Sequence, residues 1–341
     1  KNPIASTAAI SGGVVFVGTE DTGLLALDLH AKEKTGKELW RAATGATVEA
    51  SPAVEGGRVY FGDKRGVFRA LDAKSGKQIW MFEAGQEPDG GGTEISSSAV
   101  LHGGKILFGS YDACLYCLSA ADGKILWRVE TQGPVHASPA VAGDRTFVAG
   151  CDEQLRFIDI ESGKEVSVLP MGAYSAGSPA VAGDRLVLGT FGAQVLCIDL
   201  KTAKVLWTFE DPDRKFPFYA SPAVGPLRAR AAAGAGASAK PELVAVVAGR
   251  DKTARAFRIE DGKLLWTFTT KARIDASPVI VGARVIVAGM DGNLYLLDLE
   301  TGKEVWKFTA GPAFLASPAV GEGRLVISTE EGLVHCFDLK P

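Results

Sequence analysis

The sequence is poor in the features that mark membrane spans, nucleic-acid-binding proteins and disulfide scaffolds. No stretch approaches the roughly 18 consecutive apolar residues of a membrane-spanning helix. The formal net charge is −3, with acidic and basic residues interspersed, whereas nucleic-acid-binding proteins carry a basic patch or stripe. Five cysteines are too few for a disulfide scaffold, and an odd number leaves at least one thiol free. What remains is a chain with 46% hydrophobic residues, which can bury a large core.

The cysteines and histidines also show no arrangement typical of a metal or catalytic site. Cys114 and Cys117 form a CxxC pair, but the surrounding DACLYCLSA is typical of a strand, on which residues three apart face opposite sides. We therefore expect neither a redox pair nor half of a zinc site. Cys117, Cys197 and Cys336 occupy one equivalent place, in CLS, CID and CFD, where we expect small core residues. The four histidines are scattered, and we predict no catalytic residues and no metal.

One short phrase recurs along the whole chain. ASPAV stands at 50–54, 137–141, 220–224 and 316–320, with near copies such as GSPAV at 177–181, SSSAV at 96–100 and STAAI at 6–10. Alignment on its serine, or on Thr7, puts repeat starts at 7, 51, 97, 138, 178, 221, 277 and 317. A period near 40–45 residues with several short strands is typical of propeller blades.

The second repeat, residues 51–85, shows how each blade is built. SPAV predicts a short strand, RVYFG and VFRALD predict the next two, and QIWMF predicts a fourth. Glycine and aspartate clusters between them predict tight turns. The sequence thus predicts an all-β chain, with residues 1–341 forming one eight-bladed β-propeller domain of four-stranded antiparallel blades. Residues 225–242 are expected to form a flexible loop insertion in blade 6. We expect Arg228 and Arg230 to be solvated loop charges, the alternative being that they contact an acidic partner.

Two recurring sequence patterns have structural explanations. Because proline cannot donate to a strand ladder, SPAV is expected at a sheet edge, and we place it innermost, where crowding favours small residues. The pattern D-x-x-[TS]-G-K-x-x-W puts a tryptophan on the outermost strand, where it fills the space between diverging blades. These predicted docking residues are Trp40, Trp80, Trp127, Trp207, Trp266 and Trp306. Blade 4 departs from the pattern, with Ser167 in place of tryptophan.

The combination ASPAV…GRVYFG…ALDAKSGKQIW resembles the PQQ-like propeller repeat, and the resemblance covers essentially the whole chain. That family includes quinoprotein alcohol dehydrogenases and BamB-like scaffold lipoproteins of outer-membrane assembly. The resemblance implies that the dehydrogenases are much longer and hold PQQ with large loops, a vicinal disulfide and a floor tryptophan. This chain has no Cys-Cys, and its six tryptophans all stand at docking positions. We therefore expect no cofactor.

The eighth repeat is incomplete. It runs from SPAVGEGRLVIS to Pro341 without a TGKxxW segment, and KNPIAS before Thr7 contains no tryptophan. We expect that the closing strand lies upstream of Lys1, the alternative being that the first residues add poorly to blade 8. An unpaired strand at 333–339 would be an edge open to pairing with a strand of another chain. Because the chain starts with lysine, we also expect that a signal peptide or lipid anchor has been removed.

The candidate functional positions are those at which the residue differs from repeat to repeat, while the residues around them are nearly identical. The residue two before the repeat serine is Glu49, Ile95, His136, Ala176, Tyr219, Asp275 or Leu315. The polar exceptions are Glu49, His136, Tyr219 and Asp275, which we expect at one mouth of the channel. They predict either a hydrated rim, whose polar groups face water, or a ligand or partner site. One histidine and two carboxylates could bind a metal, but only if they were close together.

The sequence therefore predicts a non-catalytic scaffold that binds protein partners in the cell envelope, in the periplasm or outside the cell, as the resemblance to BamB implies. The partners expected are an envelope complex or a strand that pairs with the open edge of blade 8, and no nucleic acid. The alternative is a small-ligand-binding or PQQ-dependent dehydrogenase-type propeller that uses the channel mouth.

Overall fold

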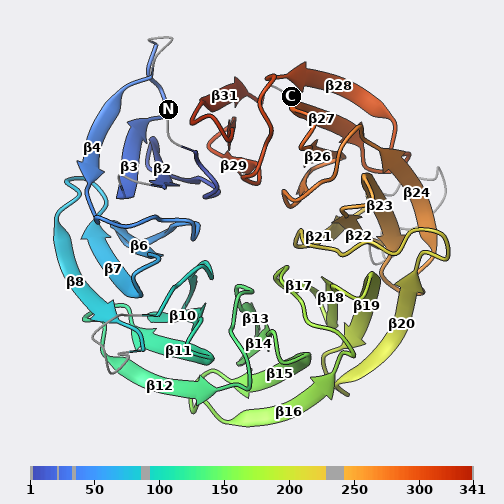
Figure 1. Cartoon of the computed structure of the whole chain (residues 1–341), viewed down its shortest axis with the longest axis horizontal. Helices are drawn as coiled ribbons and strands as arrows, with labels where there is room; N and C mark the ends of the chain where they lie inside the picture. Colours follow the sequence, from blue (N-terminus) through green and yellow to red (C-terminus); the bar gives the residue numbers. More distant parts are fainter. Residues whose placement is uncertain (1–2, 21–22, 33–35, 86–92, 228–241, 340–341) are drawn as a thin grey trace, which may run out of the picture. The chain divides into compact units, whose positions relative to one another are not determined.

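The strands form eight antiparallel sheets, and each sheet takes its strands in chain order (Figure 1). The computed structural model describes residues 3–20, 23–32, 36–85, 93–227 and 242–339. Within these ranges all of the regular secondary structure is β, seven sheets have four strands, and the eighth has three. This confirms the predicted eight-bladed β-propeller fold and the missing fourth strand of its last blade. Blades are numbered 1 to 8 along the chain.

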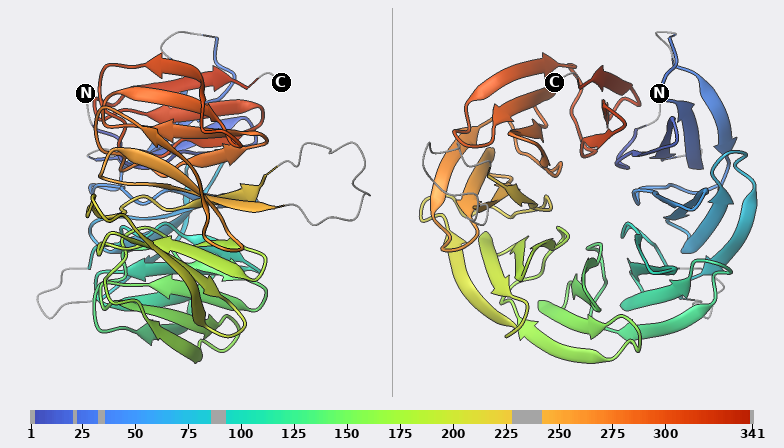
Figure 2. Two further views of the ribbon diagram at one scale, coloured as in Figure 1. Left: turned by 90° about the vertical axis from the view of Figure 1, so that its right-hand side faces the viewer. Right: turned by 180° about the vertical axis from the view of Figure 1, so that it is seen from behind.

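The sheets divide between two compact units, and their strands can be followed by colour along the sequence in Figures 1 and 2. Unit 1 comprises residues 1–174 and 315–341 and holds blades 1 to 4 and blade 8, while unit 2 comprises residues 175–314 and holds blades 5 to 7. That residues 1–341 form a single domain remains a prediction. The loop insertion at 225–242 also remains a prediction, because residues 228–241 lie outside the described residues. Arg228 and Arg230 lie there too. Gly225 and Pro226, expected in the loop, belong to a strand.

The strands of unit 1 are β1 (Ala9–Ser11), β2 (Val14–Thr19), β3 (Gly23–Asp28) and β4 (Glu38–Ala42) in blade 1; β5 (Ala53–Glu55), β6 (Arg58–Gly62), β7 (Val67–Asp72) and β8 (Gln78–Glu83) in blade 2; β9 (Val100–His102), β10 (Lys105–Ser110), β11 (Cys114–Ser119) and β12 (Ile125–Glu130) in blade 3; β13 (Ala140–Ala142), β14 (Arg145–Ala149), β15 (Gln154–Asp159) and β16 (Glu165–Pro170) in blade 4; and β29 (Ala319–Gly321), β30 (Arg324–Ser328) and β31 (Val334–Asp338) in blade 8.

The strands of unit 2 are β17 (Ala180–Ala182), β18 (Arg185–Gly189), β19 (Gln194–Asp199) and β20 (Lys204–Glu210) in blade 5; β21 (Ala223–Pro226), β22 (Leu243–Ala248), β23 (Thr253–Arg258) and β24 (Leu264–Thr269) in blade 6; and β25 (Val279–Val281), β26 (Arg284–Ala288), β27 (Asn293–Asp298) and β28 (Glu304–Thr309) in blade 7.

The core lies between consecutive blades, so the second and third strands bury both faces. In β6, Val59, Tyr60 and Phe61 are all at most 3% exposed although they alternate in direction. Phe68 of blade 2 stacks on Phe108 of blade 3, with ring centroids 4.2 Å apart. This two-sided burial explains why these strands read as continuous runs of β-branched and aromatic residues.

The serine of the recurring phrase links one blade to the next. In both units its N–H donates to the serine or threonine hydroxyl of a neighbouring repeat, over 2.9 to 3.2 Å, in the pairs Thr7 to Ser51, Ser51 to Ser98, Ser98 to Ser138, Ser317 to Thr7, Ser178 to Ser221 and Ser221 to Ser277. The strand itself begins two residues later, as at Ala53. The phrase is therefore an inter-blade hydrogen-bonding site followed by a sheet-edge strand.

This ladder corrects the alignment of the third repeat. The linking serine is Ser98, not Ser97 as the predicted start at 97 requires. The position two residues before it is therefore Ser96, and Ile95 is a fully buried core residue.

Five tryptophans contact the following blade in the same way. Each indole N–H donates to a backbone carbonyl over 2.8 to 3.3 Å, in the pairs Trp40 to Ala73, Trp80 to Ala120, Trp127 to Ile160, Trp207 to Ile259 and Trp266 to Leu299. Each ring lies over a glycine with positive φ, where an added Cβ would come within 2.5 to 2.7 Å of it: Gly76, Gly123, Gly163, Gly262 and Gly302. Trp306, at the end of unit 2, is 41% exposed. The energetic role of these residues remains a prediction.

Candidate functional site

The four predicted mouth residues lie in the loops that lead into first strands, two in each unit. Glu49 and His136 belong to unit 1, and Tyr219 and Asp275 to unit 2. Each unit brings its pair into one polar cluster, and each cluster contains residues that the sequence analysis missed.

The unit 1 cluster centres on Lys64, in the turn between β6 and β7. Lys64 Nζ lies 2.8 Å from Glu49 Oε2 and 3.3 Å from Glu94 Oε1. Ser96 Oγ donates to Glu94 Oε1 over 2.6 Å. Burial lowers the pKa of Lys64, but the hydrogen bonds and negative charges of the two carboxylates outweigh this effect and raise the pKa above its usual value. The ammonium group therefore stays charged between the two carboxylates.

An aromatic pair adjoins this ion cluster. The Tyr111 hydroxyl hydrogen-bonds to the His136 ring, whose centroid lies 4.4 Å from that of the tyrosine ring. Burial lowers the pKa of His136, against the opposing charges of Glu94 and Glu49. Burial, followed by the charge of Glu94, raises the pKa of Tyr111 to about 12. The pair is therefore neutral at physiological pH.

The unit 2 cluster holds a carboxylate between two arginines. Arg250 pairs with Asp275 through two hydrogen bonds, of 2.8 and 3.2 Å. Arg273 Nε donates to Asp275 Oδ2 over 2.9 Å. The guanidinium carbon of Arg250 lies 4.6 Å from the centroid of the Tyr219 ring, within the range of cation–π contacts. Two cations around one carboxylate give this cluster a net positive charge.

A shallow pocket of about 290 Å³ lies beside this cluster, lined by Arg214, Phe216, Arg250, Asp251, Lys252 and Thr269. Phe216 is 53% exposed. The Asp251 side chain is almost fully buried in an ion pair with Arg255, 2.6 Å away. The pocket therefore combines an exposed aromatic ring with cationic side chains, which suits an acidic partner.

The missed residues share one position in the repeat. Lys64, Tyr111 and Arg250 stand in the turn between second and third strands, and their N–H groups donate to carbonyls in loops that lead into first strands. Across the blades this position also varies, as Cys151, Phe191 and Met290 show. That variation was a signal that could have identified them.

The arrangement offers charged and aromatic contacts and no evident metal site. Within the described part of the chain, no three His, Cys, Asp or Glu residues are grouped so that they could hold a metal ion. Glu49 and Asp275 instead pair with cations. No helix among the described residues is long and apolar enough to cross a membrane.

Comparison with known families identifies the repeat. The family model described as outer membrane protein assembly factor BamB matches residues 2–110, 90–215 and 227–340. The chain belongs to the BamB family. The BamB of Alkalilimnicola ehrlichii is 46% identical over 54 residues, a match that spans 14% of this chain and 14% of that relative. The chain thus matches a small fraction of the length of this curated relative.

Solved structures share the fold at low sequence identity. BamB from Moraxella catarrhalis has a TM-score of 0.76 and 16% identity, covering 98% of this chain and 94% of that one. The computationally designed Ika8 protein has a TM-score of 0.77 and 16% identity, with 99% and 96% covered. Saccharomyces cerevisiae Sqt1 has a TM-score of 0.80 and 11% identity, with 100% and 96% covered. These similarities concern the propeller fold alone.

Proposed function

We propose that this protein is a non-catalytic scaffold that binds protein partners in the cell envelope, in the periplasm or on the outer side of the cell. The observation that carries the proposal is the BamB family match from residue 2 to residue 340. The name of that family, outer membrane protein assembly factor, describes a protein that works with other proteins. The expected partner is an envelope complex.

Two kinds of surface support protein binding. In the loops that lead into first strands and the turns beside them, Glu49, Lys64 and Tyr219 offer charge and aromatic surface and are 37 to 40% exposed. We propose that the partner contacts Glu49, His136, Tyr219 and Asp275. On the fourth strands, an apolar residue just before the tryptophan position is exposed in most blades: Leu39, Ile79, Leu126, Val166, Leu206 and Val305, each 43 to 51%. Repeated exposed apolar side chains favour protein interfaces.

Site-specific cross-linking in the native cell tests this proposal. A photo-reactive amino acid replaces Glu49 or Tyr219, and in the control it replaces Lys74, an exposed residue in the turn between β7 and β8. Because that turn lies at the opposite end of the strands, we expect cross-links to an envelope protein from the first two positions and none from the third. Mass spectrometry identifies the partner.

Charge reversal gives a second measurement. Arg250→Glu places a negative charge beside Asp275 and should reduce recovery of the partner at least tenfold, whereas Lys74→Glu should leave it unchanged. Equal recovery with both variants would exclude the unit 2 cluster as a partner site. A quinone absorbance together with dye-linked alcohol oxidation by the purified protein would contradict the non-catalytic proposal.

A further inference from the structure

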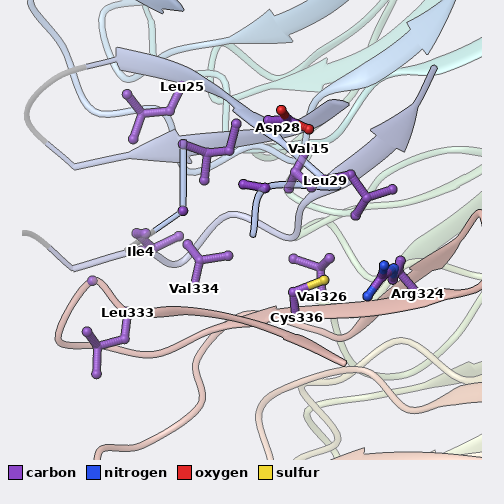
Figure 3. Close-up of a pocket in the computed structure, with 14 residues that line it drawn as sticks. Ile4, Val15, Leu25, Asp28, Leu29, Arg324, Val326, Leu333, Val334 and Cys336 are labelled. Atoms are coloured by element: carbon purple, nitrogen blue, oxygen red, sulfur yellow. The ribbon is translucent and has the colours of Figure 1, made fainter. Parts of the chain in front are cut away.

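Two pockets of the described structure differ in their chemistry. The larger, of about 750 Å³, lies along β31 in unit 1 and is lined mainly by aliphatic side chains such as Val15, Leu25 and Val334 (Figure 3). Aliphatic side chains alone do not distinguish one apolar partner from another. The smaller, of about 290 Å³, lies beside the unit 2 cluster and combines cationic side chains with the exposed ring of Phe216. The smaller pocket therefore carries more information about what it binds.

This smaller pocket is built by a loop that is longer than most of its counterparts. Trp207 stands 14 positions before Ser221, the next repeat serine. The corresponding spacing is 11 positions for Trp40, Trp127, Trp266 and Trp306. The three additional residues fall within 211–216, the stretch that supplies Arg214 and Phe216 to the pocket. Because the repeat forms without such residues elsewhere, they are candidates for a binding role.

Hydrogen bonds anchor this loop at both ends. The Asp211 carboxylate accepts two N–H groups of the loop, each over 3.0 Å, and lies 2.6 Å from the Arg255 guanidinium. At the other end the Phe218 N–H donates to the Thr190 carbonyl over 3.1 Å, and the Phe218 ring is buried. The Phe216 ring lies between these anchors and is 53% exposed. An exposed aromatic ring on an anchored loop favours contact with another molecule.

The residues that line the pocket carry a surplus of positive charge. Among them, Arg214, Arg250 and Lys252 are cationic and Asp251 is acidic. The Asp251 side chain is only 4% exposed and lies 2.6 Å from Arg255, whereas Arg214 and Lys252 are exposed. The pocket thus presents positive charge, although the formal net charge of the whole chain is −3. Its charge complements an anionic partner.

The size of the pocket favours a peptide segment over a small molecule or a nucleic acid. Small-molecule sites generally enclose roughly 300–1,000 Å³ and cover most of the ligand, whereas this pocket is shallow and has only about 290 Å³. It can accept one side chain of a larger partner whose flanking groups reach the cations. A nucleic acid would require a longer basic patch or stripe. The occupant that fits is an acidic segment with an apolar side chain between its carboxylates.

We propose that the pocket binds an acidic peptide segment of the partner protein, with an apolar side chain against the Phe216 ring and carboxylates beside Arg214 and Lys252. A guanidinium binds a carboxylate through two parallel hydrogen bonds, and a lysine adds a compact positive charge. This inference rests on the proposed function, because it names the chemistry by which unit 2 recognises a protein partner.

The backbone at Lys252 allows its charge to be removed without disturbing the turn. Its φ is +70°, and the equivalent residues of blades 2 and 7 are Gly66 and Gly292, with φ of +77° and +72°. Because glycine adopts positive φ without steric penalty, Lys252→Gly should not lower Tm. Blade 4 has Glu153 at this place, with a φ of +61°, and its side chain is exposed. Glu153→Gly is therefore the matched control in unit 1.

The test measures binding of the fluorescently labelled peptide DEDFDED to the purified protein by fluorescence anisotropy. The comparison peptide DEDADED lacks the aromatic side chain, and KRKFKRK carries the opposite charge. We expect DEDFDED to bind at least ten times more tightly than either, with an affinity that falls as the salt concentration rises. Lys252→Gly and Phe216→Ala should each weaken binding at least fivefold without lowering Tm, whereas Glu153→Gly should leave the affinity nearly unchanged.

Equal affinities for the three peptides would overturn the proposal, and so would equal affinities of the wild type and both pocket variants for DEDFDED. Vesicles of phosphatidylcholine and phosphatidylglycerol test the other anionic surface that cations attract. Vesicle binding by the wild type but not by Lys252→Gly, in the absence of any binding of DEDFDED, would overturn the peptide in favour of an anionic lipid surface.

The cross-linking test in the native cell separates a failure of this inference from a failure of the proposed function. Cross-links from Glu49 and Tyr219 to an envelope protein, with no binding of DEDFDED, would leave the scaffold proposal in place and overturn the acidic peptide. Selective binding of DEDFDED, with no cross-linked envelope protein, would support the chemistry of the pocket and contradict the proposed function.

Discussion

The junction between blades 2 and 3 and the junction between blades 8 and 1 are built on the same repeat but are completed differently. At the first, Trp80 of β8 packs against Phe68 and Tyr60 and lies over Gly123 of the next blade. At the second, three strands meet blade 1 across a groove of about 750 Å³. At a complete junction, the fourth strand therefore supplies the tryptophan that contacts the next blade.

The largest expected effect comes from removing the tryptophan of the complete junction. Trp80→Ala should lower the free energy of unfolding by about 3–5 kcal/mol, because it leaves a cavity between two blades. Chemical denaturation measures the loss. Leu333→Ala, at the open junction and 42% exposed in the wild type, is the control, and we expect less than about 1 kcal/mol there. A loss below 1 kcal/mol for Trp80→Ala would contradict its docking role.

A smaller effect on the free energy of unfolding is expected from adding one methyl group, as Gly→Ala, at Gly123 or at Gly36. Gly123 and Gly36 have similar φ values, +73° and +68°, so Gly→Ala costs both the same left-handed strain of about 1–2 kcal/mol. At Gly123 the new Cβ also comes within 2.6 Å of the Trp80 ring, which should add roughly 1–3 kcal/mol of overpacking. Denaturation of the 341-residue chain measures both. Equal losses would mean that the ring over Gly123 moves aside freely.

The smallest expected effect is the pH dependence that His136 contributes at a complete junction. His136 pairs with Tyr111 between blades 3 and 4, whereas Ala5 holds its position in blade 1. Because burial lowers the pKa of His136 below its usual 6.5, the unfolded chain binds a proton more readily. Stability from this group is complete above about pH 6.5 and is lost as pH falls.

His136→Gln should therefore flatten the fall in stability between neutral and mildly acidic pH. The difference between wild type and variant isolates this residue, because His335, whose pKa is also lowered by burial, is present in both. Parallel curves of unfolding free energy against pH would show that His136 titrates alike in both states.

The fold could be predicted because each repeat contains its own strands and turns, and six of the eight also contain the tryptophan. Alignment failed in blade 3, where Ser96, Ser97 and Ser98 look alike and only the hydrogen bonds between blades select Ser98. The mouth positions followed from variation at one place in the repeat. Variation at a second place in the repeat marks Lys64 and Arg250 as candidates too, but the residues that each one pairs with depend on packing between repeats, which no single repeat encodes.

The serine ladder has a consequence for how such chains grow. Ser51 and Ser98 each donate an N–H to one neighbouring blade and accept with the hydroxyl from the other, and Thr7 does the same as a threonine. A duplicated repeat would bring its own donor and acceptor and could enter the series without any compensating change. At the blades where these bonds occur, the ladder itself would therefore not oppose the duplication of a repeat.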